Sequence, residues 1–278
     1  MNYGDFSRGL KREFREINGV NTAIFSTDFR ENRETILLIH GINGSHFGLE
    51  FLAKKLAKTF NIILVDLPGH GESSLPKNLQ YFGIRELRDW LDEVVTFAAT
   101  LSKTSSLKLV AHSFGCYAVS SQISRNYDTI FICPVPSTTK GSQLLGHVTK
   151  ILFAWSVFAK IYNWTPFSAL RGDIMLKNAS PENRKKQRYI ANIDSQTSRK
   201  FREFQSELAI ASFRENIFVD VKPKLAIYGK YDFVPTNNSR EYLSSIFPDS
   251  RIVELPTGHL PTTEMPEELA TLIRENLL

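Results

Sequence analysis

Short apolar runs rich in Val, Ile and Leu recur along the chain, and segments with helical spacing separate most of them. The runs lie at 22–27, 35–40, 61–66, 107–112, 129–134, 224–229 and 251–256. Continuous apolar runs of this length are typical of strands buried on both faces of a parallel sheet. Their alternation with helical segments predicts an α/β fold, with a mostly parallel, doubly wound sheet and helices on both faces.

The clearest helical pattern covers residues 84–101. Its apolar positions follow steps of three and four: Ile84, Leu87, Leu91, Val94, Val95 and Ala98. Such spacing is that of an amphipathic helix. Because a doubly wound sheet binds its ligands beyond the carboxyl ends of its strands, we expect the functional residues in the loops that follow the strands.

The alternation stops between about residues 136 and 214. This segment has no convincing strand, and it is rich in aromatic, basic and helix-compatible residues. A structureless connection of this length is uncommon inside a compact domain. We therefore predict a helical cap (lid) over 136–214, inserted into a core formed by 1–135 and 215–278.

Composition limits the class of protein. Of the 278 residues, 42% are hydrophobic and 23% are charged, as in globular proteins. The first residues carry charges throughout and lack the apolar core of a secretory signal. The longest apolar stretch, at 151–164, is too short to span a bilayer. We expect a cytoplasmic protein without a transmembrane segment.

The positive charge is concentrated in the predicted cap. Residues 136–220 hold 13 Lys and Arg against 7 Asp and Glu, whereas the whole chain has a net charge of +5. This surplus predicts an anionic carrier, a coenzyme A thioester or an anionic lipid surface as a partner of the cap, although such residues are often simply solvated. Without a recognition motif or base-stacking platforms, we expect no nucleic-acid partner.

Cys116 and Cys133 are the two cysteines, too few for a disulfide framework. Their spacing from the histidines does not resemble a zinc site, so we interpret both as small buried hydrophobic residues. The glycines at 41–48 lack the Lys-Ser/Thr of a phosphate-binding loop. We expect no metal and no cofactor.

The stretch LVAHSFGCYAVS, at 109–120, places Ser113 between an apolar run and a helix-like pattern. A serine at a sharp strand-to-helix turn projects its hydroxyl into the crevice beyond the sheet, and such a turn requires small neighbours. Ala111 and Gly115 supply them. We favour Ser113 as a nucleophile, and a simple helix N-cap is the alternative.

A nucleophilic serine needs a base and an acid that orients the base. Asp232 follows the run at 224–229, and His259 follows the run at 251–256. Parallel strands end at the same edge of the sheet, so these side chains can meet Ser113 there. Asp220 and Asp194 are the alternatives for the acid.

The chain resembles the α/β-hydrolase superfamily, whose triad runs in the order Ser, Asp, His. LLIHGINGS at 37–45 and VDLPGHGES at 65–73 look like its loops after the third and fourth strands, and GHLPTTEMPEEL at 258–269 looks like its histidine loop and final helix. Ala111 departs from the G-x-S-x-G pattern. The resemblance also implies that the cap follows the sixth strand.

Carried over residue by residue, the resemblance implies that Ser113 is the nucleophile, His259 the general base and acid, and Asp232 the group that orients the imidazole. The backbone N–H groups of Ile42 and Phe114 would form the oxyanion hole. For the three other family-like loop histidines we expect structural or pocket-lining roles, with His40 shaping the oxyanion loop as the alternative: His40, His70 and His112.

The function implied is hydrolysis of a small-molecule carboxylic ester or thioester through an acyl-enzyme. Other chemistries of the superfamily use similar triads and stay open: carbon–carbon bond hydrolysis, amide hydrolysis, acyl transfer and acyl carrier methyl-ester hydrolysis. A serine at position 113 argues against dehalogenase and epoxide hydrolase chemistry, which uses an aspartate nucleophile. A non-catalytic binding protein on the same scaffold is the alternative of a different class.

Overall fold

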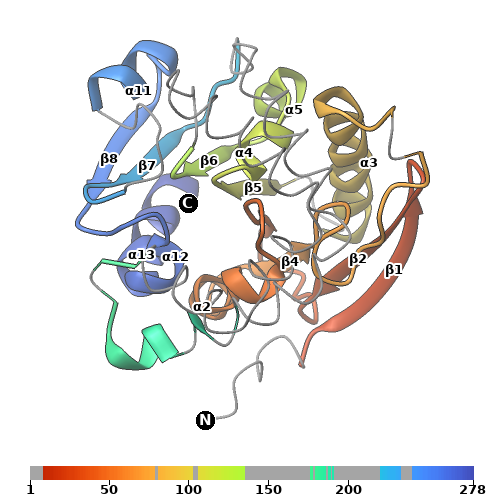
Figure 1. Cartoon of the computed structure of the whole chain (residues 1–278), viewed down its shortest axis with the longest axis horizontal. Helices are drawn as coiled ribbons and strands as arrows, with labels where there is room; N and C mark the ends of the chain where they lie inside the picture. Colours follow the sequence, from red (N-terminus) through yellow and green to blue (C-terminus); the bar gives the residue numbers. More distant parts are fainter. Residues whose placement is uncertain are drawn as a thin grey trace, which may run out of the picture.

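The structure is a computed structural model of the 278-residue chain. It describes residues 9–78, 81–102, 106–134, 176–177, 179–185, 187–188, 190, 220–232 and 240–278. Within these residues the chain forms a twisted sheet with helices on both faces (Figure 1). The fold is therefore α/β, as the alternation of runs predicts.

Eight strands form the sheet, in the order β1-β2-β4-β3-β5-β6-β7-β8. From β3 to β8 every neighbouring pair is parallel, whereas β2 runs antiparallel to both β1 and β4. The strands are β1 (Lys11–Ile17), β2 (Val20–Ser26), β3 (Thr35–Ile39), β4 (Asn61–Val65), β5 (Leu107–His112), β6 (Thr129–Ile132), β7 (Leu225–Gly229) and β8 (Arg251–Leu255).

Alternate residues of the central strands pack on opposite faces of the sheet, which gives two hydrophobic cores. In β3, Leu37 and Ile39 belong to one core, and Ile36 and Leu38 belong to the other. The same alternation occurs in β4. All of these side chains are buried, because helices cover both faces, and this explains why the strands read as continuous apolar runs.

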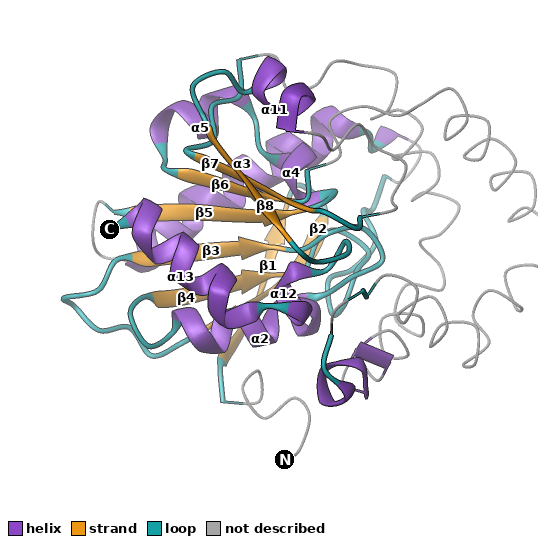
Figure 2. Ribbon diagram, turned by 90° about the vertical axis from the view of Figure 1, so that its left-hand side faces the viewer, coloured by secondary structure: helices purple, strands orange, loops and turns teal. Residues whose placement is uncertain are grey.

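The helices divide between the two faces (Figure 2). α3 (Ile84–Ser102) and α11 (Arg240–Ile246) contribute to the first core, together with the segment after β5. α2 (His46–Leu56) and α13 (Pro266–Leu277) contribute to the second, and the short α12 (Pro261–Glu264) precedes α13. The helix predicted at 84–101 is confirmed to within one residue.

The seven predicted strands all form, with ends that differ by two residues or fewer. Strand β1 was missing from the prediction. Its residues KREFREI are exposed except for Ile17, so it has no apolar run. A turn signal was present, because Asn18 and Gly19 have positive φ angles of 45° and 76°, as a two-residue hairpin requires.

The helix-like pattern after Ser113 forms two short helices rather than one. α4 (Gly115–Ala118) ends at once, and α5 (Ser121–Asn126) begins after a break at Val119 and Ser120. Both break residues are extended, and the Ser120 hydroxyl accepts a hydrogen bond from the Ile123 N–H. A serine that caps a new helix in this way interrupts the preceding one.

Most of the predicted cap at 136–214 lies outside the described residues. Part of 176–190 is described, and residues 181–185 are helical. The Ser180 hydroxyl accepts a hydrogen bond from the Asn183 N–H, at 3.1 Å, which caps this turn. The division into core and cap stays a prediction.

Candidate active site

Ser113 occupies a strained turn between β5 and α4. Its φ angle is 52°, in the left-handed region that residues other than glycine seldom adopt. The Ser113 N–H donates to the Ile132 carbonyl at 2.8 Å, and the Cys116 N–H donates to the Ser113 carbonyl at 3.0 Å. Strand pairing on one side and a helical turn on the other therefore hold the strained conformation.

Two glycines allow the loop after β3 to lie against this turn. A Cβ atom on Gly115 would be 2.5 Å from the His40 carbonyl oxygen, and one on Gly41 would be 2.9 Å from the Ser113 Cβ. Ala111, the departure from the expected glycine, is fully buried in the core and is accommodated. The turn tolerates a methyl group at Ala111, whereas Gly115 faces backbone that cannot move aside.

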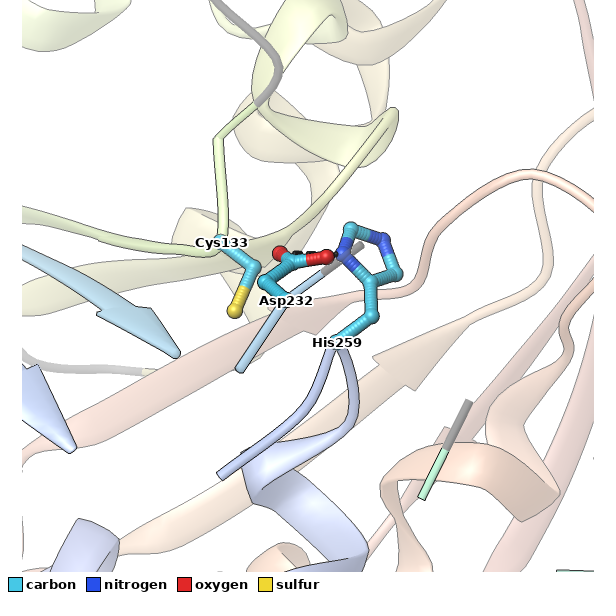
Figure 3. Close-up of side chains that lie close together, drawn as sticks. All are labelled: Cys133, Asp232 and His259. Carbon is cyan, nitrogen blue, oxygen red and sulfur yellow. Dashed lines mark hydrogen bonds and ion pairs between the residues drawn. The ribbon is translucent and has the colours of Figure 1, made fainter. Parts of the chain in front are cut away.

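Three of the predicted site residues lie in hydrogen-bonding contact. His259 Nε2 is 2.8 Å from Ser113 Oγ, and His259 Nδ1 is 2.7 Å from Asp232 Oδ2. Figure 3 shows the carboxylate of Asp232 facing the imidazole. Ser113 and His259 are each 5% exposed. An acceptor at Nδ1 places the proton there and leaves Nε2 free to accept the hydroxyl proton.

Of the alternatives for the acid, Asp220 lies in the turn before β7 and pairs with Arg125 at 3.8 Å, with both side chains more than half exposed. This turn lies at the amino ends of the parallel strands, whereas the loop that carries Asp232 follows β7 and lies at their carboxyl ends. Asp194 lies outside the described residues. The contact with His259 therefore favours Asp232.

The two predicted oxyanion-hole residues flank Ser113. Phe114 follows it directly, and Ile42 follows Gly41, which lies against the Ser113 side chain. Within the described part of the chain, neither the Ile42 N–H nor the Phe114 N–H donates to a protein acceptor. Both donors are available to a ligand.

His40 and His70 join the loops after β3 and β4. His40 Nδ1 donates to the Gly41 carbonyl at 2.7 Å, and its Nε2 accepts the Leu67 N–H at 3.0 Å. His70 accepts the Asn43 N–H at 3.2 Å and donates to the Pro68 carbonyl at 2.9 Å. Burial lowers the pKa of both, that of His70 to about 3. Both neutral rings therefore link the two loops by hydrogen bonds, and His40 binds the backbone of the loop that carries Ile42.

The sequence analysis missed a buried pair beside these loops. Asp66 is fully buried and accepts the His46 N–H at 2.7 Å, the His46 Nδ1–H at 2.9 Å and the Glu72 N–H at 2.9 Å. Burial alone would raise the pKa of Asp66, but His46, together with His40 and the Glu72 N–H, outweighs burial, and the pKa is lowered. The signal was Asp66 at the end of an apolar run, because a carboxylate placed there must find donors.

His112 supports the backbone of the histidine loop. Its Nε2 lies 2.9 Å from the His259 carbonyl oxygen, which only accepts hydrogen bonds, so Nε2 carries the proton. Burial and the neighbouring His259 lower the pKa of His112 to about 3. A neutral His112 therefore fixes the backbone of His259 from the β5 side.

Cys133 lies beside the candidate triad (Figure 3). Its Sγ, a carboxylate oxygen of Asp232 and a ring nitrogen of His259 lie within 4.8 Å of one another, close enough to hold a metal ion. However, the carboxylate and the imidazole already share a hydrogen bond, and burial raises the pKa of the Cys133 thiol well above its ordinary value. A protonated thiol is a poor metal ligand, so the cluster fits a carboxylate–imidazole hydrogen bond better than a metal site.

A family model described as the alpha/beta hydrolase family matches residues 36–272. The chain belongs to the alpha/beta hydrolase family. The match includes both loop motifs, the turn at Ser113 and the histidine loop, so the resemblance inferred from those motifs is confirmed.

Proteins of known structure share the fold over nearly the whole chain. A membrane phospholipase A described as a bacterial virulence factor is 19% identical, with a TM-score of 0.72, over 97% of this chain and 86% of that chain. The thioesterase domain from the curacin biosynthetic pathway is 16% identical, with a TM-score of 0.68, over 95% and 99%.

A sequence relative is a probable oxidoreductase, EphD, of Mycobacterium tuberculosis, which is 28% identical over 102 residues. The match covers 37% of this chain and 17% of that protein. In the described residues of the chain itself, as opposed to EphD, no helix combines the length and apolar character needed to cross a membrane.

The close approach at the elbow predicts that Gly115→Ala destabilises the hydrolase core. The added methyl group would overlap the His40 carbonyl, and overpacking of this kind costs about 1–3 kcal/mol in free energy of unfolding. The matched control is Gly48→Ala in α2, where a Cβ would meet nothing within 4 Å. The free energy of unfolding of this control, measured with urea, should equal that of the wild type or be slightly higher. Equal stability of the two variants would contradict the close approach.

The lowered pKa of His70 predicts a dependence of stability on pH. Between its folded pKa of about 3 and its ordinary value of 6.5, only the unfolded chain binds the proton. The free energy of unfolding therefore falls as the pH drops below 6.5. His70→Asn should reduce this slope by up to about 1.4 kcal/mol per pH unit, measured by urea unfolding at mildly acidic pH. An unchanged slope would mean that His70 is protonated in the folded protein.

Proposed function

We propose that this alpha/beta hydrolase cleaves a carboxylic ester or thioester through an acyl-enzyme intermediate. The observation that carries the proposal is the continuous contact from Ser113 Oγ through His259 to Asp232, at 2.8 and 2.7 Å. A serine hydroxyl in this arrangement attacks acyl carbons. Among the fold neighbours, one is named as a phospholipase and one as a thioesterase domain, in keeping with both bond types.

In the first half of the proposed reaction, Ser113 Oγ attacks the acyl carbon while His259 Nε2 takes the hydroxyl proton. The carbonyl oxygen becomes an oxyanion and accepts hydrogen bonds from the N–H groups of Phe114 and Ile42. The bond to the leaving oxygen or sulfur then breaks, and His259 gives its proton to that atom. The product is an acyl ester of Ser113 and a free alcohol or thiol.

In the second half, a water molecule attacks the acyl ester. His259 takes a proton from the water, the same two N–H groups hold the oxyanion, and the proton returns to Ser113 Oγ as the carboxylic acid leaves. Asp232 keeps the Nδ1–H proton in place and stabilises the imidazolium in both halves. Each step balances with water as the sole co-reactant.

The proposal predicts one covalent adduct, on Ser113, after treatment with a fluorophosphonate, which mimics the tetrahedral intermediate. Intact-mass analysis should show the adduct on the wild type but not on Ser113→Ala, and much slower labelling of His259→Ala. Hydrolysis of p-nitrophenyl esters of increasing acyl length should then define the acyl preference. A folded wild type that neither labels nor turns over any ester would favour the non-catalytic binding protein.

The role of Asp232 predicts that Asp232→Asn lowers kcat about 10³- to 10⁴-fold, because the amide stabilises the wrong imidazole tautomer. Asp220→Asn is the matched control, since Asp220 pairs with Arg125 at the surface. It should keep the activity of the wild type on the same ester. Activity that survives in Asp232→Asn and is lost in Asp220→Asn would reassign the acid.

A further inference from the structure

Glu264 joins two segments that are far apart in the sequence. Glu264 is the last residue of the short helix α12, which begins two residues after His259. The residue is 6% exposed. Oε1 accepts the N–H of Gly258 at 2.8 Å, and Oε2 accepts the N–H of Lys177 at 2.8 Å. One buried carboxylate thus binds the backbone of the histidine loop and the backbone of the segment predicted to be the cap.

Further hydrogen bonds attach this part of the chain to α12. We call the described residues between 176 and 190 the docking segment; its helical turn is the short green helix beside α12 in Figure 1. The Asn183 amide donates to the Thr263 carbonyl at 2.8 Å, and the Thr263 hydroxyl donates to Gln187 at 3.1 Å. Thr263 and Gln187 are both buried, so this contact is shielded from water.

The docking segment also holds Lys177 in place for Glu264. Arg184, on the helical turn, donates to the Lys177 carbonyl at 3.0 Å, while the Lys177 N–H donates to Glu264. The backbone carbonyl and the backbone N–H of Lys177 are therefore both hydrogen-bonded. A displacement of the docking segment would lengthen or break the hydrogen bond between Lys177 and the Glu264 carboxylate.

Glu264 acts at the residue before His259. Gly258 is pressed against β7, because a Cβ on Gly229 would be 2.1 Å from the Gly258 carbonyl oxygen. His112 holds the His259 carbonyl from the other side. Among these contacts between described residues, the one through Glu264 leads to the docking segment.

We propose that Glu264 is a positioning residue that couples the attachment of the docking segment to the alignment of His259 with Ser113. The proposal rests on the proposed function. When the segment is docked, both carboxylate oxygens are satisfied and the histidine loop is held. When the segment is displaced, a buried charge loses one of its donors, and the histidine loop loses a fixed support.

The negative charge of Glu264 suits this role. Two N–H groups approach separate oxygens, and a carboxylate accepts at both. A glutamine has one carbonyl oxygen and would place its NH₂ group against the second N–H. Glu264→Gln therefore keeps the shape of the side chain and removes one of the two attachments, which are stronger for an ionised acceptor.

The first experiment compares Glu264→Gln with Glu268→Gln, an exposed glutamate on α13. We expect Glu264→Gln to slow phosphonylation of Ser113 by a fluorophosphonate about tenfold, with a matching fall in kcat and little change in KM. Glu268→Gln should react as the wild type does. If Glu264 only stabilises the fold, thermal unfolding will shift while the folded variant labels at the wild-type rate, and the proposal fails.

The second experiment tests the coupling without altering Glu264. Lys177→Pro removes the N–H that donates to Oε2, whereas Lys177→Ala keeps it. Lys177→Pro should slow phosphonylation about threefold relative to Lys177→Ala, and it should add little to Glu264→Gln in the double variant. Equal rates in the two Lys177 variants would confine Glu264 to local support of the histidine loop and overturn the coupling.

Hydrogen exchange separates this proposal from the proposed function. Lys177→Pro should raise amide exchange around Gly258 as well as around Lys177, because the two share Glu264; exchange confined to the docking segment overturns the coupling. If the wild type fails to label at Ser113, the proposed function fails and exchange alone decides the coupling. If the wild type labels but Glu264→Gln labels equally fast, only the positioning role is lost.

Discussion

The parallel pairing of β3, β5, β6, β7 and β8 is the constraint on which the site depends. Because these strands run in one direction, their carboxyl ends lie on one side of the sheet, and so do the loops that carry Ser113 and the other candidate site residues. Ser113, Asp232 and His259 are up to 146 residues apart in sequence, yet they meet through hydrogen bonds.

Backbone packing and buried hydrogen bonds then set the geometry at this edge. Gly115 lets the turn after β5 lie on the His40 carbonyl, which places the loop after β3 beside Ser113. The neutral rings of His40 and His70 and the carboxylate of Asp66 satisfy the N–H groups of these loops. Since these hydrogen bonds are made inside the protein, they hold the shape of the loops without support from solvent.

The histidine loop differs from the others in how it is held. His112 and β7 are parts of the core, whereas Glu264 shares its carboxylate between the histidine loop and the docking segment. Under the coupling that we propose, the attachment of the docking segment therefore influences the alignment of the His259 imidazole.

The sequence by itself determined the strands and the helix that have clear apolar patterns. It also determined which candidate residues follow the predicted strands. Strand β1 escaped because an edge strand exposed to water needs no apolar run. The break after Ala118 escaped because helix and cap signals overlap at Val119 and Ser120.

Only the tertiary structure decided which groups share a partner. It brought Asp232 into contact with His259, paired His46 with Asp66, and gave Glu264 two donors from distant loops. Local patterns record burial and turn chemistry, whereas these choices depend on distances between segments that the sheet brings together.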